Sequence, residues 1–263
     1  MSLSGPFLDA DRLLRETFLA DVRLFAQLPS TNDYAHAAAR EGARTPLLIV
    51  ADEQTAGRGR GANRWMTGAG ALTFSLLLEP RKLGMPLASW PILSLACGAS
   101  VALALETLLG PRADVRVKWP NDVYLEGAKV CGILVETPKS SPDSLIIGIG
   151  INVNNLREAA PAEVQKRMIS LADVAGQELP RTDVLIEVLQ QLRRQFDAVA
   201  EVPGAVIESC RARCFLTGRL LSVSDGVRTV SGTCLGLDDD GALRVATAEG
   251  QQRCVAGSVE LLD

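Results

Sequence analysis

The part of the chain best suited to chemistry is a cationic, glycine-rich stretch. It reads "ADEQTAGRGRGANRWMTGAG" over residues 51–70 and carries Arg58, Arg60 and Arg64, with no acidic residue after its first three positions. Positive charge on so pliable a backbone indicates an anionic ligand. Neither common phosphate loop is present, because G-x-x-x-x-G-K-[ST] does not occur and Ala62 stands where G-x-G-x-x-G needs its last glycine. We therefore expect an anion held by another arrangement.

Two lysines and an aspartate lie near the ends of predicted strands. "VKWPNDV" puts Lys118 before a Pro-Asn-Asp corner, where Asp122 is placed to orient a base or hold a metal. The alternative for Lys118 is an exposed lysine beside a tight turn. Lys129 follows among small and apolar residues in "GAKVCG". It either extends its ammonium group to the surface or binds an anion, and we favour the anion.

The strand "IGIGINVN" has two unlike faces. At a period of two residues, isoleucines and a valine form one face, and Gly148, Gly150, Asn152 and Asn154 form the other. Glycine in a strand often marks the close approach of a ligand or of another backbone. The second face is therefore either the floor of a ligand site or a surface packed closely against a helix. Gly132, three residues after Lys129, also indicates room kept for a ligand.

No nucleophile has a base beside it in the sequence. The only histidine, His36, follows the cap-like "STND" in an alanine-rich helical pattern, which favours a helix surface and argues against histidine-based triads and metal sites. Loop arginines, strand-end lysines and a glycine floor suit a reaction in which the protein neutralises developing negative charge. Phosphoryl or nucleotidyl transfer is such a reaction.

The elements that must position these residues predict an α+β domain with a mixed β-sheet. We expect strands at 47–51, 71–79, 115–119, 123–136 (a hairpin turning at 126–127) and 144–154, and helices at 32–40, 87–109 and 182–200. The pattern over 161–170 fits a helix or a polar loop. After Cys214, short alternating strands punctuated by Asp-Gly and Glu-Gly predict a small antiparallel barrel. We place the domain boundary between residues 212 and 213.

Composition narrows the class of protein. The net charge of −4 argues against nucleic acid as a partner. Residues 83–105 carry no charge, but prolines and a glycine interrupt them, which favours a buried helix over a membrane span. The N-terminus lacks the pattern of a signal peptide. Six cysteines without a C-x-x-C pair favour reduced thiols in the cytoplasm.

Five segments, in this order and spacing, resemble bacterial biotin–protein ligases. They are "STN" (30–32), "QTAGRGRGANRW" (54–65), "KWPNDV" (118–123), "KVCGILVE" (129–136) and "GIGINVN" (148–154). The C-terminal part resembles the small SH3-like barrel of that family. The resemblance implies a ligase domain like that of class II synthetases. It also implies the family's reaction: biotin and ATP, with Mg²⁺, give biotinyl-5′-adenylate, and biotin then passes to one lysine of a biotin carboxyl carrier domain, typically that of acetyl-CoA carboxylase.

The resemblance also implies site residues. Those expected to bind biotin are Ser30, Thr31, Asn32, Gln54, Arg58, Gly59, Arg60, Lys129, Gly132 and Gly148. Those expected to meet the nucleotide are Arg60, Trp65, Asn121 and Asn152, and the catalytic set is Arg60, Lys118, Asp122 and Lys129. In the family pattern the loop closes over the carboxylate and phosphate with inward backbone N–H groups, and Arg60 retains the reactive adenylate. No metal-binding side chain is expected.

The sequence departs from the family pattern in three places. Ala62 and Asn63 replace a glycine and an arginine of the loop, and no tryptophan follows Asn155, where Met168 lies near the place of the residue that packs on adenine. Only 29 residues precede Ser30, so we expect the ligase-only form, without DNA or membrane contacts and with a homodimer as one expected assembly. The alternatives are a lipoate–protein ligase and a non-catalytic biotin sensor.

Overall fold

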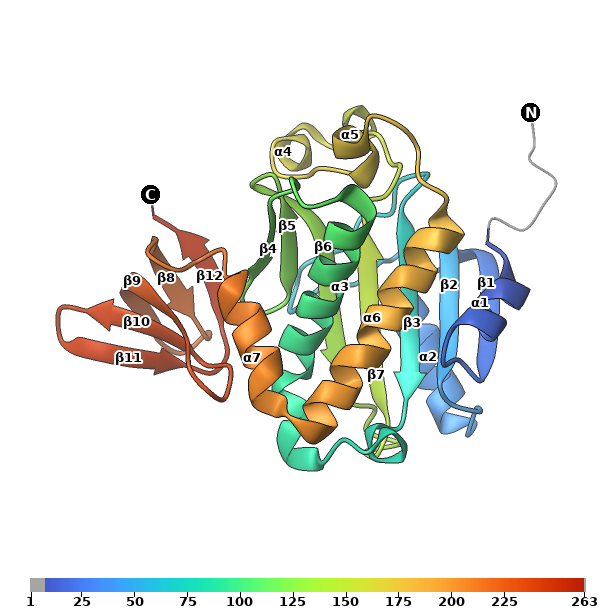
Figure 1. Ribbon diagram of the computed structural model, residues 1–263, viewed down its shortest axis with the longest axis horizontal. Coiled ribbons are helices and arrows are strands. Elements are labelled where there is room, and N and C mark those ends of the chain that lie inside the picture. The colour runs from blue at the N-terminus through green and yellow to red at the C-terminus, as the bar shows by residue number, and fades with distance from the viewer. Residues whose placement is uncertain (1–7, 263) are drawn as a thin grey trace.

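The computed structural model describes residues 8–262, without the side chains of residues 87 and 88, and arranges its strands in two sheets. The larger is a seven-stranded sheet in the order β1-β2-β3-β7-β6-β5-β4, and the smaller has five strands near the C-terminus. Figure 1 shows the larger sheet covered by long helices, with the smaller sheet at one end of the molecule. The site depends on the edges and connections of the larger sheet.

The larger sheet is mixed, as predicted. Its strands are β1 (Asp21–Leu28), β2 (Leu47–Gln54), β3 (Leu72–Leu78), β4 (Val115–Lys118), β5 (Asp122–Leu125), β6 (Ala128–Glu136) and β7 (Leu145–Ile151). Strands β1 and β2 are parallel, and every other neighbouring pair is antiparallel. The predicted hairpin turns at Glu126 and Gly127, both of which have positive φ. Strand β1 was not predicted from the sequence.

The two unlike faces of β7 are explained by its register at the centre of the sheet. Gly148 lies opposite Ser75 of β3 on one side, and Gly150 lies opposite Thr73. On the other side Gly150 lies opposite Gly132 of β6. Small and hydroxyl-bearing residues of three strands therefore share one face. The isoleucines of β7 are buried, and most of them belong to the main core.

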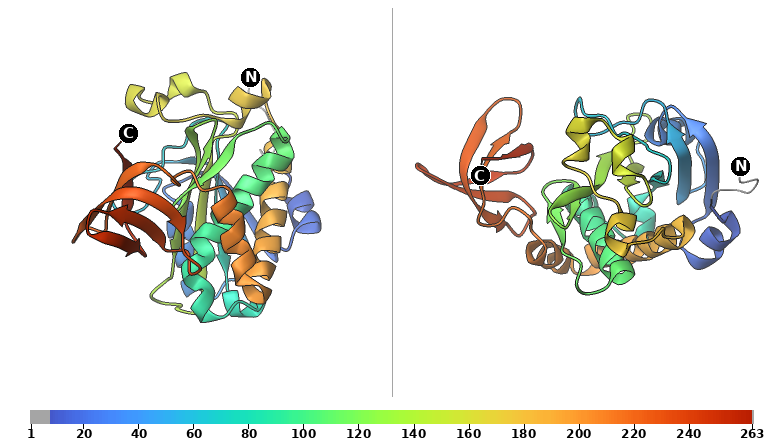
Figure 2. Two further views of the ribbon diagram at one scale, coloured as in Figure 1. Left: turned by 60° about the vertical axis from the view of Figure 1, so that its left-hand side comes forward. Right: turned by 90° about the horizontal axis from the view of Figure 1, so that it is seen from above.

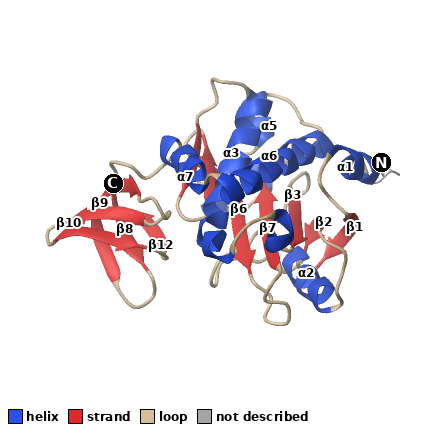
Figure 3. Cartoon of the chain, turned by 60° about the horizontal axis from the view of Figure 1, so that its bottom comes forward, coloured by secondary structure: helices blue, strands red, loops and turns tan. Residues whose placement is uncertain are grey.

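Helices cover both faces of the larger sheet. Helices α3 (Leu93–Leu109) and α6 (Arg181–Glu201) cover one face, with α7 (Pro203–Ala212) packed against both of them, while α2 (Thr31–Arg40) lies on the opposite face, as Figure 3 shows. Helix α1 (Ala10–Glu16) lies beside β1. The shorter helices are α4 (Ala162–Gln165) and α5 (Leu171–Ala175), and the 3-10 turns are η1 (Pro80–Leu83), η2 (Leu87–Ile92) and η3 (Arg157–Ala159). The undecided segment 161–170 thus contains one short helix.

The uncharged segment forms the central helix of the core. Among the residues that the structure describes, one helical segment, Ser89–Leu109, is long and apolar enough to cross a membrane, and 67% of its most apolar window is buried inside the protein. Its C-terminal part is α3, which packs against α6, α7 and strands β4, β5 and β6. A core helix meets the same length and composition criteria as a membrane span, and the burial observed agrees with the predicted core helix.

The C-terminal sheet is antiparallel and follows the predicted turns. Its strands are β8 (Leu220–Ser224), β9 (Thr229–Leu237), β10 (Leu243–Thr247), β11 (Gly250–Cys254) and β12 (Ser258–Leu261), in the order β11-β10-β9-β8-β12. Gly226, Gly241 and Gly250 have positive φ, which explains the glycine in each Asp-Gly or Glu-Gly turn. Within the described residues β11 and β12 are the two edges of this sheet, so hydrogen bonding between strands does not close the predicted barrel.

The two sheets are joined through the corner that follows β4. The indole Nε1 of Trp119 donates to the Gly241 carbonyl at 3.1 Å. Arg211, near the end of α7, donates to the Leu237 carbonyl at 2.9 Å. The views in Figure 2 show the C-terminal sheet beside this end of the larger domain. Strand β12 is thereby brought near residues that are far away in sequence.

Candidate functional site

A cavity of about 460 Å³ lies between the glycine-rich loop, the centre of the larger sheet and strand β12. Of the predicted site residues, those that line it are Ser30, Thr31, Asn32, Gln54, Arg58, Gly59, Arg60, Trp65, Lys118, Asn121, Asp122, Lys129, Gly132 and Gly148. Asn152 does not line it. Five sequence segments thus contribute to one cavity, although they span more than a hundred residues of the chain.

The glycine-rich loop forms a small hairpin. The Gly59 N–H donates to the Asn63 carbonyl at 2.9 Å, and the Trp65 N–H donates to the Gly57 carbonyl at 3.2 Å. A Cβ at Gly57 would lie 2.4 Å from the Trp65 carbonyl oxygen, so this hairpin requires glycine there. In this conformation the Gly59 N–H is used within the loop and does not face the cavity. Asn63 closes the hairpin through its main-chain carbonyl, so this hydrogen bond does not depend on the side chain at position 63.

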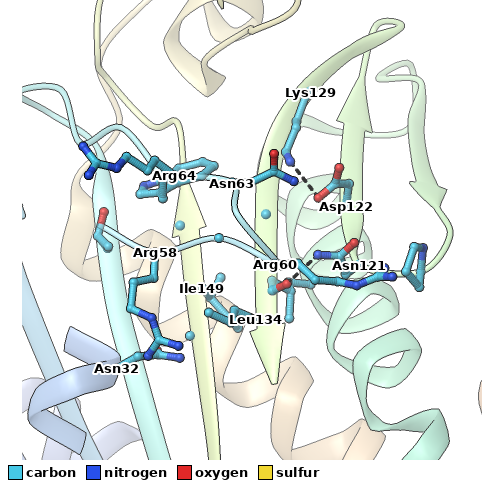
Figure 4. A pocket seen from close by; sticks show the side chains of 18 of the residues that line it. Asn32, Arg58, Arg60, Asn63, Arg64, Asn121, Asp122, Lys129, Leu134 and Ile149 are labelled. Atoms are coloured by element: carbon cyan, nitrogen blue, oxygen red, sulfur yellow. Dashed lines mark hydrogen bonds and ion pairs between the residues drawn. The ribbon is translucent and has the colours of Figure 1, made fainter. Parts of the chain in front are cut away.

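The three loop arginines point in different directions. Arg58 forms ion pairs with Glu136 at 2.6 Å and with Asp33 at 2.8 Å. Arg60 donates to the Gly257 carbonyl of the C-terminal sheet at 2.7 Å. In Figure 4 Arg58 extends toward Asn32, Arg60 extends toward Asn121, and Arg64 points away from both. The loop therefore presents no single cluster of guanidinium groups in this conformation, in contrast to the simplest interpretation of its sequence.

The positive charge of the cavity gathers instead around the Pro-Asn-Asp corner. Lys129 Nζ lies 2.7 Å from Asp122 Oδ1, and Figure 4 shows the two side chains facing each other. Lys118 Nζ lies 3.4 Å from the Tyr124 hydroxyl. Burial lowers the pKa of Lys118; Asp122 opposes this shift, and nearby cations that include Lys129 and Arg167 reinforce it. Three cations near one carboxylate favour an anionic ligand.

Two asparagines hold this corner in place. The Asn121 side-chain amide donates to the Ile133 carbonyl at 2.7 Å, and the Asn121 main-chain carbonyl accepts the Ile133 N–H at 2.9 Å. These two bonds attach the corner to β6. Asn152 is 6% exposed, and its side-chain oxygen accepts from Asn155 at 3.0 Å. Its amide nitrogen lies 3.5 Å from the Lys129 carbonyl. Asn152 therefore supports the backbone of Lys129 from outside the cavity.

The glycine floor is already partly covered by side chains. A Cβ at Gly148 would lie 2.2 Å from Asn32 Oδ1, and a Cβ at Gly150 would lie 2.2 Å from the Trp65 ring. Gly148 thus packs closely against helix α2, which is the second of the two interpretations of this strand, although it also lines the cavity. The Trp65 Nε1 atom is buried without a hydrogen-bond partner among the described residues.

Replacing Gly148 by alanine should destabilise the fold. The new methyl group would meet Asn32 Oδ1 at 2.2 Å, and overpacking of this kind costs about 1–3 kcal/mol. At this chain length we expect the unfolding midpoint to fall by roughly 2–10 °C, measured by thermal unfolding of the free protein. Gly204→Ala in α7 is the matched control, because nothing lies within 4 Å of its Cβ position. An unchanged midpoint for Gly148→Ala would contradict this account of the floor.

Several lining residues were not identified from the sequence. Arg167 belongs to the segment whose structure was left undecided, and Ser258 and Val259 come from β12. Thr73 was detectable, because it alternates with Ser75 along β3 on the glycine face of the sheet. Met168, expected near the adenine, is 7% exposed, lies beside Lys129 and does not line the cavity.

Comparison with known proteins reveals similarity in both parts of the chain. Residues 24–154 match the family described as Biotin/lipoate A/B protein ligase family, and residues 222–262 match the Biotin protein ligase C terminal domain. These two matches cover most of the residues that line the cavity, including those of β12.

Individual proteins are similar over most of the chain. The Bifunctional ligase/repressor BirA of Bacillus subtilis is 34% identical over 240 residues, which is 89% of this chain and 72% of that protein. The Biotin--[acetyl-CoA-carboxylase] ligase of Mycobacterium tuberculosis is 32% identical over 221 residues, 83% of this chain and 80% of that protein. A structure of biotin protein ligase from Aquifex aeolicus in complex with biotin and ATP superposes with a TM-score of 0.79 at 30% identity, covering 92% of this chain and 98% of that chain.

Proposed function

We propose a function for this chain on the premise that it belongs to the biotin/lipoate A/B protein ligase family. The protein is an ATP-dependent biotin–protein ligase. It activates biotin with ATP to biotinyl-5′-adenylate and transfers the biotinyl group to a lysine of a carboxylase carrier protein. Biotin and ATP are therefore its small-molecule substrates.

The chemistry requires the cavity to bring two anions together. A carboxylate oxygen of biotin attacks the α-phosphorus of ATP, the bond to the bridging oxygen breaks, and pyrophosphate leaves. The amine of the carrier lysine then attacks the acyl carbon of the mixed anhydride, and AMP leaves. Both steps develop or move negative charge, so cations placed beforehand stabilise the transition state more than the separated reactants.

One observation carries this proposal: a single cavity has a neutral hydrogen-bonding end and a cationic end. Thr31 and Gln54 are hydrogen-bonded beside Ser30 at the first end, where the charge of Arg58 is paired with Asp33 and Glu136, and Lys118 and Lys129 lie near each other at the second. Biotin has the same two ends, a neutral ureido ring and a carboxylate. We assign the ring to the first end and the carboxylate, with the phosphates, to the second.

Within this arrangement Lys129 steers the biotin carboxylate toward the α-phosphorus, and Lys118 stabilises charge at the phosphate or meets the incoming lysine. Asp122 keeps Lys129 oriented through their ion pair. Arg60 bridges the loop and the C-terminal sheet beside the cavity, where it helps to retain the adenylate.

Mg²⁺ fits this site as a companion of ATP. Asp122 is the acidic side chain of the cavity lining, and Mg²⁺ is commonly bound by one or two carboxylates together with substrate phosphates. Among residues 8–262 no group of three His, Cys, Asp or Glu side chains is arranged to hold a metal. The ion would therefore be held mainly by the phosphates of ATP, whose charge it would neutralise, and Asp122 is the carboxylate of the lining that could contact it beside Lys129.

The test is biotin-dependent exchange of labelled pyrophosphate into ATP, with lipoate and octanoate as controls. We expect exchange with biotin alone, because the neutral end of the cavity offers hydroxyl and amide groups that a ureido ring can use. Exchange with lipoate instead would keep the two-step mechanism but reject the assignment of the acid. A folded protein that binds biotin without exchange would favour the alternative of a biotin sensor.

We also propose that the protein acts in the cytoplasm without DNA or a membrane as partner, and that it forms a homodimer in one of its ligand states. The net charge of −4 supports the absence of a DNA partner, because non-specific DNA binding depends on basic surfaces. The free thiols of all six cysteines support a reducing compartment. Sedimentation of the protein with and without biotin and ATP tests whether it dimerises. A gel shift at low salt tests whether it binds DNA.

A further inference from the structure

A chain of polar contacts lies behind the hydrogen-bonding end of the cavity, and the proposed reaction gives it no role. It begins at Glu136, the last residue of β6, which does not line the cavity. It continues through Asn32 and Ser75 to Thr31, which does line the cavity. Ser75 is fully buried and Asn32 is 4% exposed, so water does not complete their hydrogen bonds.

Glu136 is held in its ionised form. Burial tends to raise the pKa of Glu136, but hydrogen bonds from Asn32 and Arg58 and the charge of Arg58 outweigh burial and hold that pKa below its usual value. Its Oε1 accepts from Arg58 at 2.6 Å, and its Oε2 accepts from Asn32 Nδ2 at 2.8 Å and from a second Arg58 nitrogen at 3.1 Å. His36 Nε2 lies 3.5 Å from the same Oε2. An ionised carboxylate only accepts hydrogen bonds.

This acceptor fixes the side-chain amide of Asn32. The amide NH₂ must face Glu136, so the amide oxygen faces Ser75. Ser75 Oγ lies 2.6 Å from Asn32 Oδ1 and 2.7 Å from Thr31 Oγ1. A serine hydroxyl has one proton, and an amide oxygen can only accept. The Ser75 proton therefore belongs to Asn32, and Ser75 must in turn accept from Thr31.

The direction of these hydrogen bonds decides what the cavity offers to a ligand. The Thr31 proton serves Ser75 rather than Gln54 Oε1, which lies farther away, at 3.1 Å, and already accepts the Thr31 N–H at 2.7 Å. Thr31 Oγ1 is left as an acceptor and Gln54 Nε2 as a donor. Ser30 Oγ accepts the Asp33 N–H at 3.4 Å as a helix cap and keeps its own proton to donate.

We propose that Glu136 is a positioning residue that sets the hydrogen-bond direction of the biotin pocket through Asn32 and Ser75. The inference rests on the proposed function and deepens it. A ureido ring has two N–H donors and a carbonyl oxygen with two lone pairs, so Thr31 can accept from one ring N–H while Ser30 and Gln54 both donate to the carbonyl oxygen. A dithiolane ring has neither N–H nor carbonyl groups, so the same polarity selects biotin over lipoate.

The test exchanges the amide and the carboxylate of the hydrogen bond between Asn32 and Glu136. In E136Q the new NH₂ meets either Asn32 Nδ2 or the Arg58 guanidinium, and turning the Asn32 amide to relieve this reverses the bond to Ser75. N32D places a carboxylate oxygen against Glu136. In N32D/E136Q the new amide donates to the new carboxylate, whose other oxygen accepts from Ser75 as before. All three variants keep the side-chain shapes, and the double variant also keeps the net charge.

We expect each single variant to raise the Kd for biotin about ten-fold or more, because one buried donor or acceptor loses its partner. The Kd for ATP should not change. The double variant should return the biotin Kd to within about three-fold of wild type, since the contact between positions 32 and 136 is again satisfied and Arg58 keeps its shorter bonds to Oε1 of residue 136 and to Asp33. Isothermal titration of the whole chain measures all four proteins, and thermal unfolding shows which of them are folded.

Unchanged biotin affinity in both single variants, or a double variant no better than the worse single one, would overturn the proposal. Ser75→Ala provides a second test of the proposal if E136Q or N32D does not fold. That change should weaken biotin binding by itself, and adding E136Q to it should have no further effect, whereas independent sites would give additive losses. If the wild type shows biotin-dependent pyrophosphate exchange but N32D/E136Q does not recover the biotin Kd, only the role of Glu136 is rejected. If the wild type does not bind biotin, the proposed function is rejected with it.

Discussion

Replacing Lys129 by alanine should lower the rate of biotin-dependent adenylate formation by about 10²–10³-fold, the usual cost of removing one well-placed group that stabilises transition-state charge. Its ammonium group lies 2.7 Å from Asp122 in the cavity, and its backbone is held by the Arg167 carbonyl at 2.8 Å and by Asn152. Lys129 is therefore positioned before any substrate binds, and its loss removes the cation that is paired with Asp122.

The measurement for this variant is single-turnover formation of the adenylate at saturating biotin and ATP, so that binding does not mask the chemical step. Lys139→Ala is the matched control, because Lys139 is an exposed lysine that does not line the cavity. A rate for Lys129→Ala within a few-fold of wild type would remove Lys129 from the catalytic set. A raised KM for biotin with an unchanged rate would restrict Lys129 to substrate binding.

Replacing Arg60 by glycine should release the adenylate from the protein. The Arg60 guanidinium extends from the loop to the Gly257 carbonyl, so it links the loop to the C-terminal sheet beside the cavity. Without this link and its charge, we expect the adenylate to dissociate about 10²-fold faster, which corresponds to the loss of one or two charge-assisted hydrogen bonds. The free adenylate would then acylate lysines of unrelated proteins.

Two readouts test the Arg60 variant. Rapid filtration of preformed adenylate gives its release rate, and blotting for biotin on bovine serum albumin measures labelling of a protein that is not a substrate. Arg64→Gly is the matched control, because it adds the same backbone freedom to the same loop while its side chain points away from Arg60. Tight retention by Arg60→Gly, or equal labelling by both variants, would contradict the proposed role of Arg60.

Much of the fold followed from local patterns. The alternation in "IGIGINVN" predicted a strand with two unlike faces, and β7 has them because the period of a strand is two residues whatever its neighbours are. Ser30 was expected to cap a helix, and it accepts the Asp33 N–H at the start of α2. Such features depend on residues a few positions apart, and the sequence displays that spacing directly.

Strand β1 shows where local patterns fail. It is an edge strand whose residues are at most half-buried, with charged Asp21 and Arg23 among its first three positions. Val22 and Leu24 do alternate with these charges, but Phe25 follows on the charged face, so the alternation that identifies a strand with one buried face is short. The parallel ladder to β2 forms this strand, and that partner begins 26 residues after Asp21. This pairing depends on the path of the chain through α2 back to the sheet, which the residues of β1 do not reveal.

What the sequence determined by itself is the set of chemical groups available to the site: a glycine-rich cationic loop, lysines beside a Pro-Asn-Asp corner and a strand with a bare face. Tertiary structure alone decided which of these groups meet. Arg58 binds Glu136, 78 residues away, and Arg60 binds Gly257, 197 residues away. The physical reason is that a guanidinium group pairs with whichever carboxylate or carbonyl the packing brings within about 3 Å. Local sequence encodes neither that distance nor the direction in which Glu136, through Asn32, orients the hydrogen bonds of the pocket.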